Sequence, residues 1–337
     1  MLSIKDLRAH YITPARTVKA VDGVSLNVQE NEILGIAGES GCGKSTLVKV
    51  MYGFVERPLQ IVSGSVEARV VNDHGQPMTV QTQDMRQLWW RHISYVPQGS
   101  MSVLNPVLRI DGQFFDAIPK SYRQRDRRTI RTDLVEYLRN LDLPPTVLRS
   151  YPHQLSGGMR QRVTVALATF LHPAIVLADE PTTALDVVVQ RGILGILTRL
   201  QRNMRNSLVV VSHDMGVHYQ ITQRLAIMYA GKIVEVGPTE SVFKEALHPY
   251  TDVLIKSLPR IGDHAVRAGI TGAPPSLVAP PGGCRFAARC EFARAICRDR
   301  EPELLEIAPQ HQVACHMVEA TRGGRANGWS TIPAPSS

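Results

Sequence analysis

This sequence lacks long hydrophobic runs. The longest, "VTVALATFLHPAIVLA" (163 to 178), is interrupted by His172 and Pro173, whereas a membrane-spanning helix needs about 20 consecutive apolar residues. The first residues, "MLSIKDLRAHYI", contain no basic region followed by an apolar core, so we expect no secretory signal. These absences argue against an integral membrane protein and favour a cytosolic one.

Cysteine is scarce over most of the chain. Only Cys42 lies outside the last sixth, and the other four are Cys284, Cys290, Cys297 and Cys315. Thiols stay reduced in the cytosol, where clustered cysteines more often bind metal than form disulfides. The four C-terminal cysteines are therefore a candidate metal site, and Cys42 is interpreted as a small filler.

Basic residues exceed acidic ones by 38 to 30. A surplus of this sign suits nucleic acid, phosphate ligands or an anionic membrane surface. Part of the surplus lies in "KSYRQRDRRTIR" (120 to 131), which we interpret as the solvated face of a helix.

Short β-branched runs alternate with helical patterns along the chain. Four of them predict buried strands: "EILGIAG", "HISYVPQ", "AIVLADE" and "SLVVVSHD". Such alternation predicts a largely parallel sheet covered by helices. The run "LAIMYAGKIVEVG" (225 to 237) predicts an added antiparallel hairpin around a two-residue Ala-Gly turn.

The strongest local signal is "GESGCGKS" (38 to 45), which matches the phosphate-binding loop motif and lies between a predicted strand and a predicted helix. Its glycines let backbone N–H groups turn toward phosphate oxygens, and the helix start adds partial positive charge. We expect Lys44 to reach the β- and γ-phosphates and the Ser45 hydroxyl to bind Mg²⁺. The expected nucleotide contacts in this stretch, hereafter the P-loop, are Gly38, Ser40, Gly41, Cys42, Gly43, Lys44 and Ser45, followed by Thr46.

Two carboxylates end the apolar run "IVLADE" (175 to 180). Ligands gather at the carboxyl ends of strands in open α/β sheets. Asp179 is expected to hold the magnesium ion, and Glu180 to polarise the attacking water. With a P-loop upstream, the pair indicates nucleotide hydrolysis.

The stretch "LSGGMRQR" (155 to 162) resembles the signature of ABC-type ATPases, and its companions follow in that family's order. Gln98 in "YVPQ" is similar to the Q-loop residue, "TALD" (183 to 186) to the D-loop, and His213 in "VVVSHD" to the switch histidine. Tyr11 lies where the family carries an aromatic residue that stacks on adenine. The resemblance implies an α/β P-loop ABC ATPase fold: a mixed sheet with an antiparallel part and an inserted helical subdomain.

The resemblance also implies roles for these residues. Ser156, Gly157 and Gly158 would offer a hydroxyl, N–H groups and a helix start to the nucleotide of an opposing subunit, so a dimer is implied. Gln98 would join Ser45 and Asp179 as a magnesium ligand and act in catalysis with Glu180 and His213. Asp186 would lie at the dimer seam and could also cap the helix that follows it.

Three stretches look like the oligopeptide/dipeptide importer branch of the family: "QGSMSVLNPVLRI" (98 to 110), "YPHQLSGGMRQRV" and "HPYTDVLIKSLP" (248 to 259). This resemblance implies an ATPase at the cytoplasmic face of the membrane. Its partners would be two permease subunits, an extracytoplasmic binding protein, and a second ATPase that forms a heterodimer or homodimer with it. Peptides are the first expectation for the solute, and oligosaccharides and nickel stay open.

The tail cysteines resemble those of this branch, some members of which carry a [4Fe–4S] cluster. The spacing C-x5-C-x6-C-x17-C is wider than the C-x2–4-C typical of structural zinc, and four thiolates on a Pro/Gly-flanked segment suit a cluster. Zinc and metal-free thiols remain alternatives. A structural role is expected, because the tail has few apolar residues of its own.

Composition suggests the domain boundaries. We expect an ABC nucleotide-binding domain over 1–257 with a helical subdomain at about 100–170, and a Pro/Gly-rich linker over 258–283. A small irregular cysteine-rich domain would occupy 284–320, and 321–337 would form a loosely ordered tail.

Two alternatives to an importer remain. The excess of basic over acidic residues and a possible zinc ribbon at the four cysteines are compatible with a soluble ABC ATPase that acts on nucleic acid. Such proteins usually carry two cassettes or a long coiled coil, whereas here each motif occurs once and no sustained heptads appear. The other is an exporter ATPase, but exporters often fuse the cassette to membrane helices.

Overall fold

The computed structural model describes all residues except 72–74, 100–102, 120–121, 123–125, 259–269 and 321–337. The chain divides into two units, each interrupted in sequence. The first unit contains Met1, 28–33 and 68–211, and the second contains 2–27, 34–67 and 212–337. Among the described residues, no helix has the length and apolar character needed to cross a bilayer.

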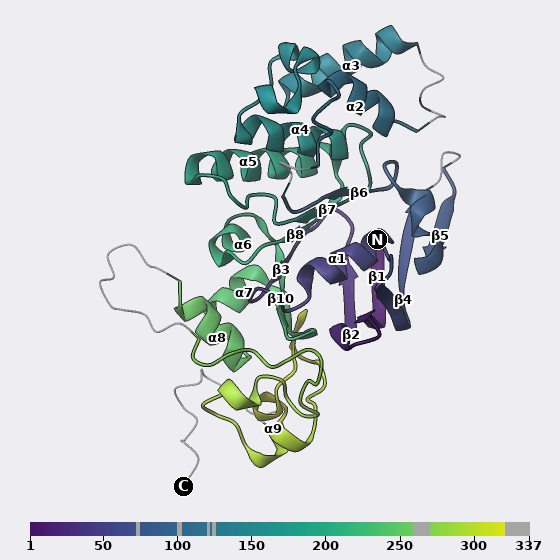
Figure 1. Cartoon of the computed structure of the whole chain (residues 1–337). Helices are drawn as coiled ribbons and strands as arrows, with labels where there is room; N and C mark the ends of the chain where they lie inside the picture. Colours follow the sequence, from purple (N-terminus) through teal and green to yellow (C-terminus); the bar gives the residue numbers. More distant parts are fainter. Residues whose placement is uncertain (72–74, 100–102, 120–121, 123–125, 259–269, 321–337) are drawn as a thin grey trace. The chain divides into compact units, whose positions relative to one another are not determined.

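The first unit is built on three parallel strands (Figure 1). Strand β7 (Ile175–Asp179) lies between β6 (Ile93–Val96) and β8 (Ser207–Val211) and pairs in parallel with both. All residues of β7 and β8 are buried. Their apolar, β-branched sequences fit strands covered on both faces, so this part of the sheet lies in the core.

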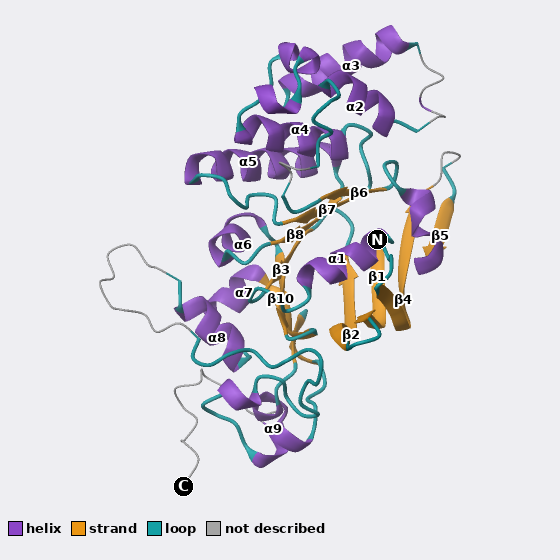
Figure 2. Cartoon of the chain, viewed as in Figure 1, coloured by secondary structure: helices purple, strands orange, loops and turns teal. Residues whose placement is uncertain are grey.

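Helices make up most of the rest of the first unit (Figure 2). They are α2 (Ile110–Ala117), α3 (Arg127–Arg139), α4 (Gly157–Thr169) and α5 (Val187–Met204), with 3₁₀ turns at Thr82–Leu88, Pro145–Arg149 and Pro152–Gln154 and a short strand β5 (Pro77–Gln81). Apolar residues of α5 at helical spacing are buried, among them Ile193, Leu197 and Leu200. Amphipathic packing of this kind stabilises a surface helix.

The second unit contains a mixed group of strands. Strand β3 (Ile33–Ala37) pairs in parallel with β9 (Arg224–Tyr229), and β9 forms an antiparallel hairpin with β10 (Lys232–Pro238). Strand β10 also pairs antiparallel with β12 (His311–Val313), which pairs with β11 (Leu305–Ala308). Residues more than 65 positions downstream of the hairpin thus join its sheet.

Another sheet and several helices complete the second unit. Strands β2 (Thr17–Val28), β1 (Leu2–Ile12) and β4 (Leu59–Val71) are neighbours in that order. The helices are α1 (Lys44–Tyr52), α6 (Met215–Ile221), α7 (Thr239–Lys244), α8 (Pro249–Lys256), α9 (Ala295–Asp299) and α10 (His316–Ala320), with a 3₁₀ turn at Ala287–Arg289.

The four predicted strands and the hairpin are confirmed to within three residues at each end, and Tyr229 pairs with Lys232 beside the Ala-Gly turn. The expectation of an irregular C-terminal domain is wrong, because β11 and β12 are regular strands. They form because β10 leaves one edge free for pairing. The domain boundaries themselves stay a prediction, and the expected tail 321–337 and part of the linker lie outside the described residues.

Candidate nucleotide-binding site

The P-loop connects β3 to α1 and depends on its glycines. Gly38 and Gly43 have φ angles of +147° and +109°, and only glycine adopts such values without strain. A Cβ on Gly43 would come within 2.0 Å of the Ala20 carbonyl oxygen, and one on Gly38 within 2.1 Å of the Met228 carbonyl oxygen. The loop is therefore packed against neighbouring backbone, which fixes its path.

Lys44 lies at the start of α1 and is buried, with 5% exposure. Its Nζ donates hydrogen bonds to the carbonyl oxygens of Gly38 (2.7 Å) and Glu39 (2.9 Å), so the ammonium group is held across the loop. Tyr11 lies in the same unit, with its hydroxyl 3.2 Å from Thr46 Oγ1 in the first turn of α1. The P-loop, Lys44 and Tyr11 thus form one connected group of residues.

The two carboxylates predicted to act in hydrolysis lie in the first unit. Asp179 ends β7, is almost fully buried, and accepts a hydrogen bond from the Tyr95 hydroxyl (3.0 Å). Glu180 Oε2 accepts from Gln98 Nε2 (2.9 Å) and from Thr183 Oγ1 (2.7 Å). The structure therefore brings Gln98 and Glu180 together. It also adds contacts from Tyr95 and Thr183, which lie in the quoted stretches "YVPQ" and "TALD" but were given no role from the sequence.

Glu180 also has an unusual backbone. Its φ of +47° lies in the left-handed region, which few residues with a side chain adopt. Its N–H donates to the Val211 carbonyl oxygen (2.9 Å), which holds the turn after β7 in place. Backbone strain of this kind is found most often at functional sites. The strain supports a functional role for Glu180.

The signature residues begin α4. Ser156 is the N-cap, and its hydroxyl accepts a hydrogen bond from the Met159 N–H (3.3 Å). A Cβ on Gly158 would come within 2.8 Å of a methyl group of Val189 in α5, so glycine lets α4 and α5 approach closely. Asp186 caps α5 through the Val189 N–H (2.9 Å), which confirms the predicted capping.

His213 follows β8 and lies in the second unit, on a short turn. A second histidine, His218, which was not predicted from the sequence, contacts this turn. His218 is fully buried, and burial lowers its pKa to about 4, so the ring is neutral at pH 7. Its Nε2–H donates to the Ser212 carbonyl oxygen (3.1 Å). The Asp214 N–H bonds to the Ser212 hydroxyl (3.0 Å). Two hydrogen bonds to Ser212 therefore position the turn that carries His213.

The four C-terminal cysteines share one small cavity, hereafter the cysteine cavity. Cys284, Cys290, Cys297 and Cys315 line it, together with His248, Pro249, Phe286, Ala287, Phe292, His316 and Met317. Burial raises the pKa of Cys290 to about 11 and that of Cys315 to about 12. Within the described ranges, no three His, Cys, Asp or Glu side chains are arranged to hold a single metal ion. The thiols are gathered but do not form a preformed single-ion site.

Known proteins are similar to this chain in sequence and in fold. The family described as "ABC transporter" matches residues 21–183, and "Oligopeptide/dipeptide transporter, C-terminal region" matches 234–297. The dipeptide transport ATP-binding protein DppD of Caldanaerobacter subterraneus is 38% identical and is matched over 98% of its length and 96% of this chain. DppD of Bacillus subtilis is 36% identical, over 95% of both chains.

Solved structures agree with these relatives. The cassette MJ0796, in a dimeric post-hydrolysis state with ADP and Pi, has a TM-score of 0.59 and 27% identity, and the match covers 99% of it and 71% of this chain. The fold is that of a P-loop ABC ATPase. The chain belongs to the ABC transporter family, among its ATP-hydrolysing subunits.

Proposed function

We propose that this chain energises an importer that takes up peptides. The observation that carries the proposal is the presence, on one chain, of the ABC ATPase motifs and of a region matching the C-terminal part of oligopeptide and dipeptide transporters. The relatives named for dipeptide transport support peptides over oligosaccharides or nickel. The comparisons give the nucleic-acid and exporter alternatives no support.

For catalysis, we assign the phosphates to the P-loop and Lys44, whose ammonium would exchange its carbonyl partners for phosphate oxygens. Ser45, Gln98 and Asp179 offer the oxygen donors that Mg²⁺ prefers, and the ion would neutralise charge on the β- and γ-phosphates. Glu180 would act as general base on the attacking water. Gln98 and Thr183, which donate to its Oε2, would orient the carboxylate.

His213 would serve the same nucleotide as Lys44 and Glu180, near its γ-phosphate. Ser156 and Gly158 at the start of α4 would instead contact the nucleotide of the opposing cassette, with Asp186 at the seam. The dimeric state of the MJ0796 relative supports this arrangement. We further propose two permease subunits, an extracytoplasmic binding protein and a second, different ATPase as partners, with the chain peripheral on the cytoplasmic face of the membrane.

The importer assignment is tested by isolation with its partners. Affinity purification of the chain from its native membrane in mild detergent should recover two permeases in stoichiometric amounts. Addition of peptide and binding protein should stimulate the ATPase activity of the complex reconstituted in vesicles. Stimulation by an oligosaccharide instead of a peptide would contradict the solute class, and ATPase stimulation only by nucleic acid would contradict the importer.

We also propose that Cys284, Cys290, Cys297 and Cys315 hold a [4Fe–4S] cluster that ties the C-terminal segment together. Four thiols on one cavity supply the cysteine ligands that such clusters use. Burial favours the neutral thiols, so a positive group is needed to stabilise four thiolates there. Zinc is the alternative, but the described cysteines do not converge on one ion.

The cluster predicts a coloured protein. Anaerobically purified chain should be brown and contain about four iron atoms per chain, and Cys297→Ser should lose most of both. Cys42→Ala is the matched control, because Cys42 is buried in the P-loop and does not line the cysteine cavity, so it should keep colour and iron. A colourless protein with one zinc per chain would contradict the cluster.

A further inference from the structure

An ion pair joins the cysteine-rich region to the P-loop. Arg289, which precedes Cys290, donates from Nη1 to Glu39 Oε2 (2.8 Å) and from Nη2 to Glu39 Oε1 (3.0 Å). Glu39 is the second residue of the P-loop. A two-pronged arginine–carboxylate pair is among the strongest and most directional contacts in proteins.

The surroundings of Arg289 allow its guanidinium group one position. Its side chain is only 5% exposed. The remaining N–H groups donate to the carbonyl oxygens of Thr271 (2.9 Å) and Ile270 (3.2 Å) and to the Tyr229 hydroxyl (3.2 Å). The hydrogen bonds to Glu39 also raise the pKa of Arg289, so the charge is permanent. Arg289 is thus a fixed cation against which the P-loop is placed.

Glu39 connects this cation to the phosphate-binding lysine. Its N–H donates to the hydroxyl of Tyr250 (2.8 Å), a fully buried residue of α8, and its carbonyl oxygen accepts from Lys44 Nζ (2.9 Å). The side chain, N–H and carbonyl of one P-loop residue therefore contact Arg289, Tyr250 and Lys44. A displacement of Glu39 would move the loop and the lysine together.

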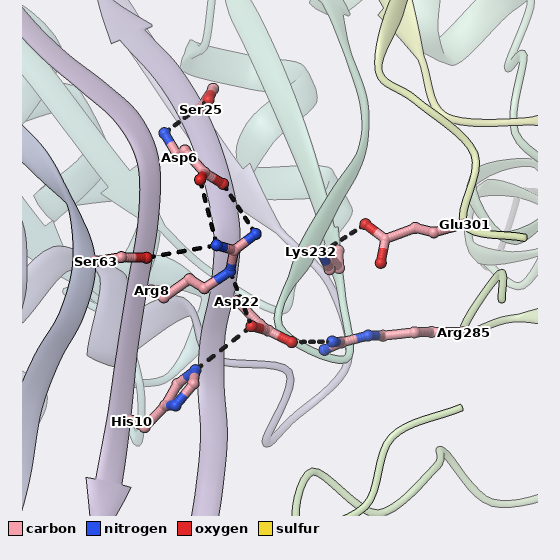
Figure 3. A network of polar contacts seen from close by, with 9 residues as sticks. All are labelled: Asp6, Arg8, His10, Asp22, Ser25, Ser63, Lys232, Arg285 and Glu301. Atoms are coloured by element: carbon pink, nitrogen blue, oxygen red, sulfur yellow. Dashed lines mark hydrogen bonds and ion pairs between the residues drawn. The ribbon is translucent and has the colours of Figure 1, made fainter. Parts of the chain in front are cut away.

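A second arginine of the same turn reaches the other side of the loop. Arg285, which follows Cys284, is buried and donates to Asp22 (Figure 3). It also donates to the Ala230 carbonyl oxygen. The adjoining Gly231 N–H donates to the carbonyl oxygen of Cys42 in the P-loop (2.8 Å), and its own carbonyl accepts from the Asp22 N–H (3.0 Å). The P-loop is thus linked to this turn at both Glu39 and Cys42.

The cysteine segment, residues 284–297, fixes the turn that carries both arginines. The Ala287 N–H bonds to the Cys284 carbonyl oxygen (3.0 Å), and the Arg289 N–H to that of Phe286 (2.9 Å). The Cys284 N–H bonds to the Cys297 carbonyl oxygen (2.7 Å). The thiols at the two ends of this turn, Cys284 and Cys290, line the cysteine cavity. The order of the cysteine segment therefore decides where the guanidinium groups lie.

We propose that Arg289 is a positioning residue for ATP binding. Through Glu39 it holds the P-loop in its phosphate-binding shape and neutralises a carboxylate that would otherwise repel the triphosphate. A glycine-rich loop loses entropy when it is ordered, so a loop held in advance binds its ligand more tightly. The proposal needs an ordered cysteine segment and does not depend on which group the thiols hold.

The test compares ATP affinity with hydrolysis rate in the full chain. Arg289→Gln should raise the Kd for Mg·ATP about tenfold, because the loop is freed and the Glu39 charge is left unpaired. The hydrolysis rate at saturating ATP should change by less than about twofold, since a ground-state binding contact affects affinity more than turnover. Arg289→Lys keeps the charge and loses the two-pronged geometry, so its Kd for Mg·ATP should lie between those of the wild type and Arg289→Gln. The matched control is Arg298→Gln, which replaces an exposed arginine directly after the cysteine segment and should leave Kd unchanged.

A double variant separates this role from general destabilisation. If Arg289 acts through Glu39, the variant Arg289→Gln/Glu39→Gln should bind ATP no worse than Arg289→Gln alone, because residues that act as one unit give non-additive effects. Additive losses, or an unchanged Kd in folded Arg289→Gln, would overturn the proposal. Iron and zinc are measured on the same samples. A weaker Kd at unchanged metal content supports the ion pair, and a weaker Kd only in samples that lost metal overturns it. Failure of the [4Fe–4S] assignment would appear in the metal analysis alone and leave this test intact.

Discussion

Replacing Glu180 with glutamine should reduce ATP hydrolysis by about 10²- to 10⁴-fold and leave ATP binding intact, because the amide keeps the size of the side chain but cannot accept a proton. Gln98 and Thr183 both donate to Glu180 Oε2, so the side chain is already oriented before nucleotide binds. The variant should therefore accumulate as an ATP-bound closed dimer. Steady-state phosphate release and size-exclusion chromatography with Mg·ATP measure the two effects.

The control for this variant is Glu136→Gln. Glu136 is an exposed residue of α3 in the same unit, so the substitution changes the charge equally at a site without a proposed role. It should hydrolyse ATP at the wild-type rate. Hydrolysis by Glu180→Gln at a near wild-type rate would remove that carboxylate from the role of base.

Gly43→Ala should abolish measurable ATP binding. The new Cβ would lie 2.0 Å from the Ala20 carbonyl oxygen at a φ of +109°, so the P-loop or the strand beside it must move. Either shift displaces Lys44, the next residue, from the position that its hydrogen bonds to Gly38 and Glu39 define. The measurements are the Kd for Mg·ATP and the thermal unfolding midpoint.

Gly41→Ala separates steric overlap from backbone strain. Gly41 also has a positive φ, +79°, but a Cβ there would meet no atom within 4 Å. The strain alone should cost about 1–2 kcal/mol of stability. Gly41→Ala should therefore remain folded with a modestly lower thermal unfolding midpoint. The midpoint of Gly43→Ala should fall further. Equal midpoints for the two variants would show that the overlap at Ala20 is relieved without cost.

Sequence reasoning found the elements that are encoded locally. The strands that precede the P-loop and Asp179 are short apolar runs next to turn residues, and a single run of residues defines the P-loop itself. Asp186 could be identified as a cap because capping involves residues three positions apart. In these cases the interacting groups are close in the chain, so pattern and spacing were sufficient.

Contacts that depend on the folded chain were not predictable in this way. Arg289 and Glu39 are separated by 250 positions, and no spacing rule connects them. Strand β12 is only three residues long, so its own sequence carries little strand signal. It forms through its pairing with β10. His218 was not singled out in the sequence, because its burial and its hydrogen bond to Ser212 depend on the packing of the folded chain.

The pairing of β12 with β10 has a consequence for solubility. An open edge on a strand as apolar as β10 would be a template for another copy of the chain and so for aggregation. The C-terminal residues cover that edge and leave β11 outermost, a strand of four residues with alternating exposure and an acidic side chain at Glu306. Short charged edges discourage pairing between molecules. The residues between Cys297 and Cys315 thus also protect the chain against self-association through β10.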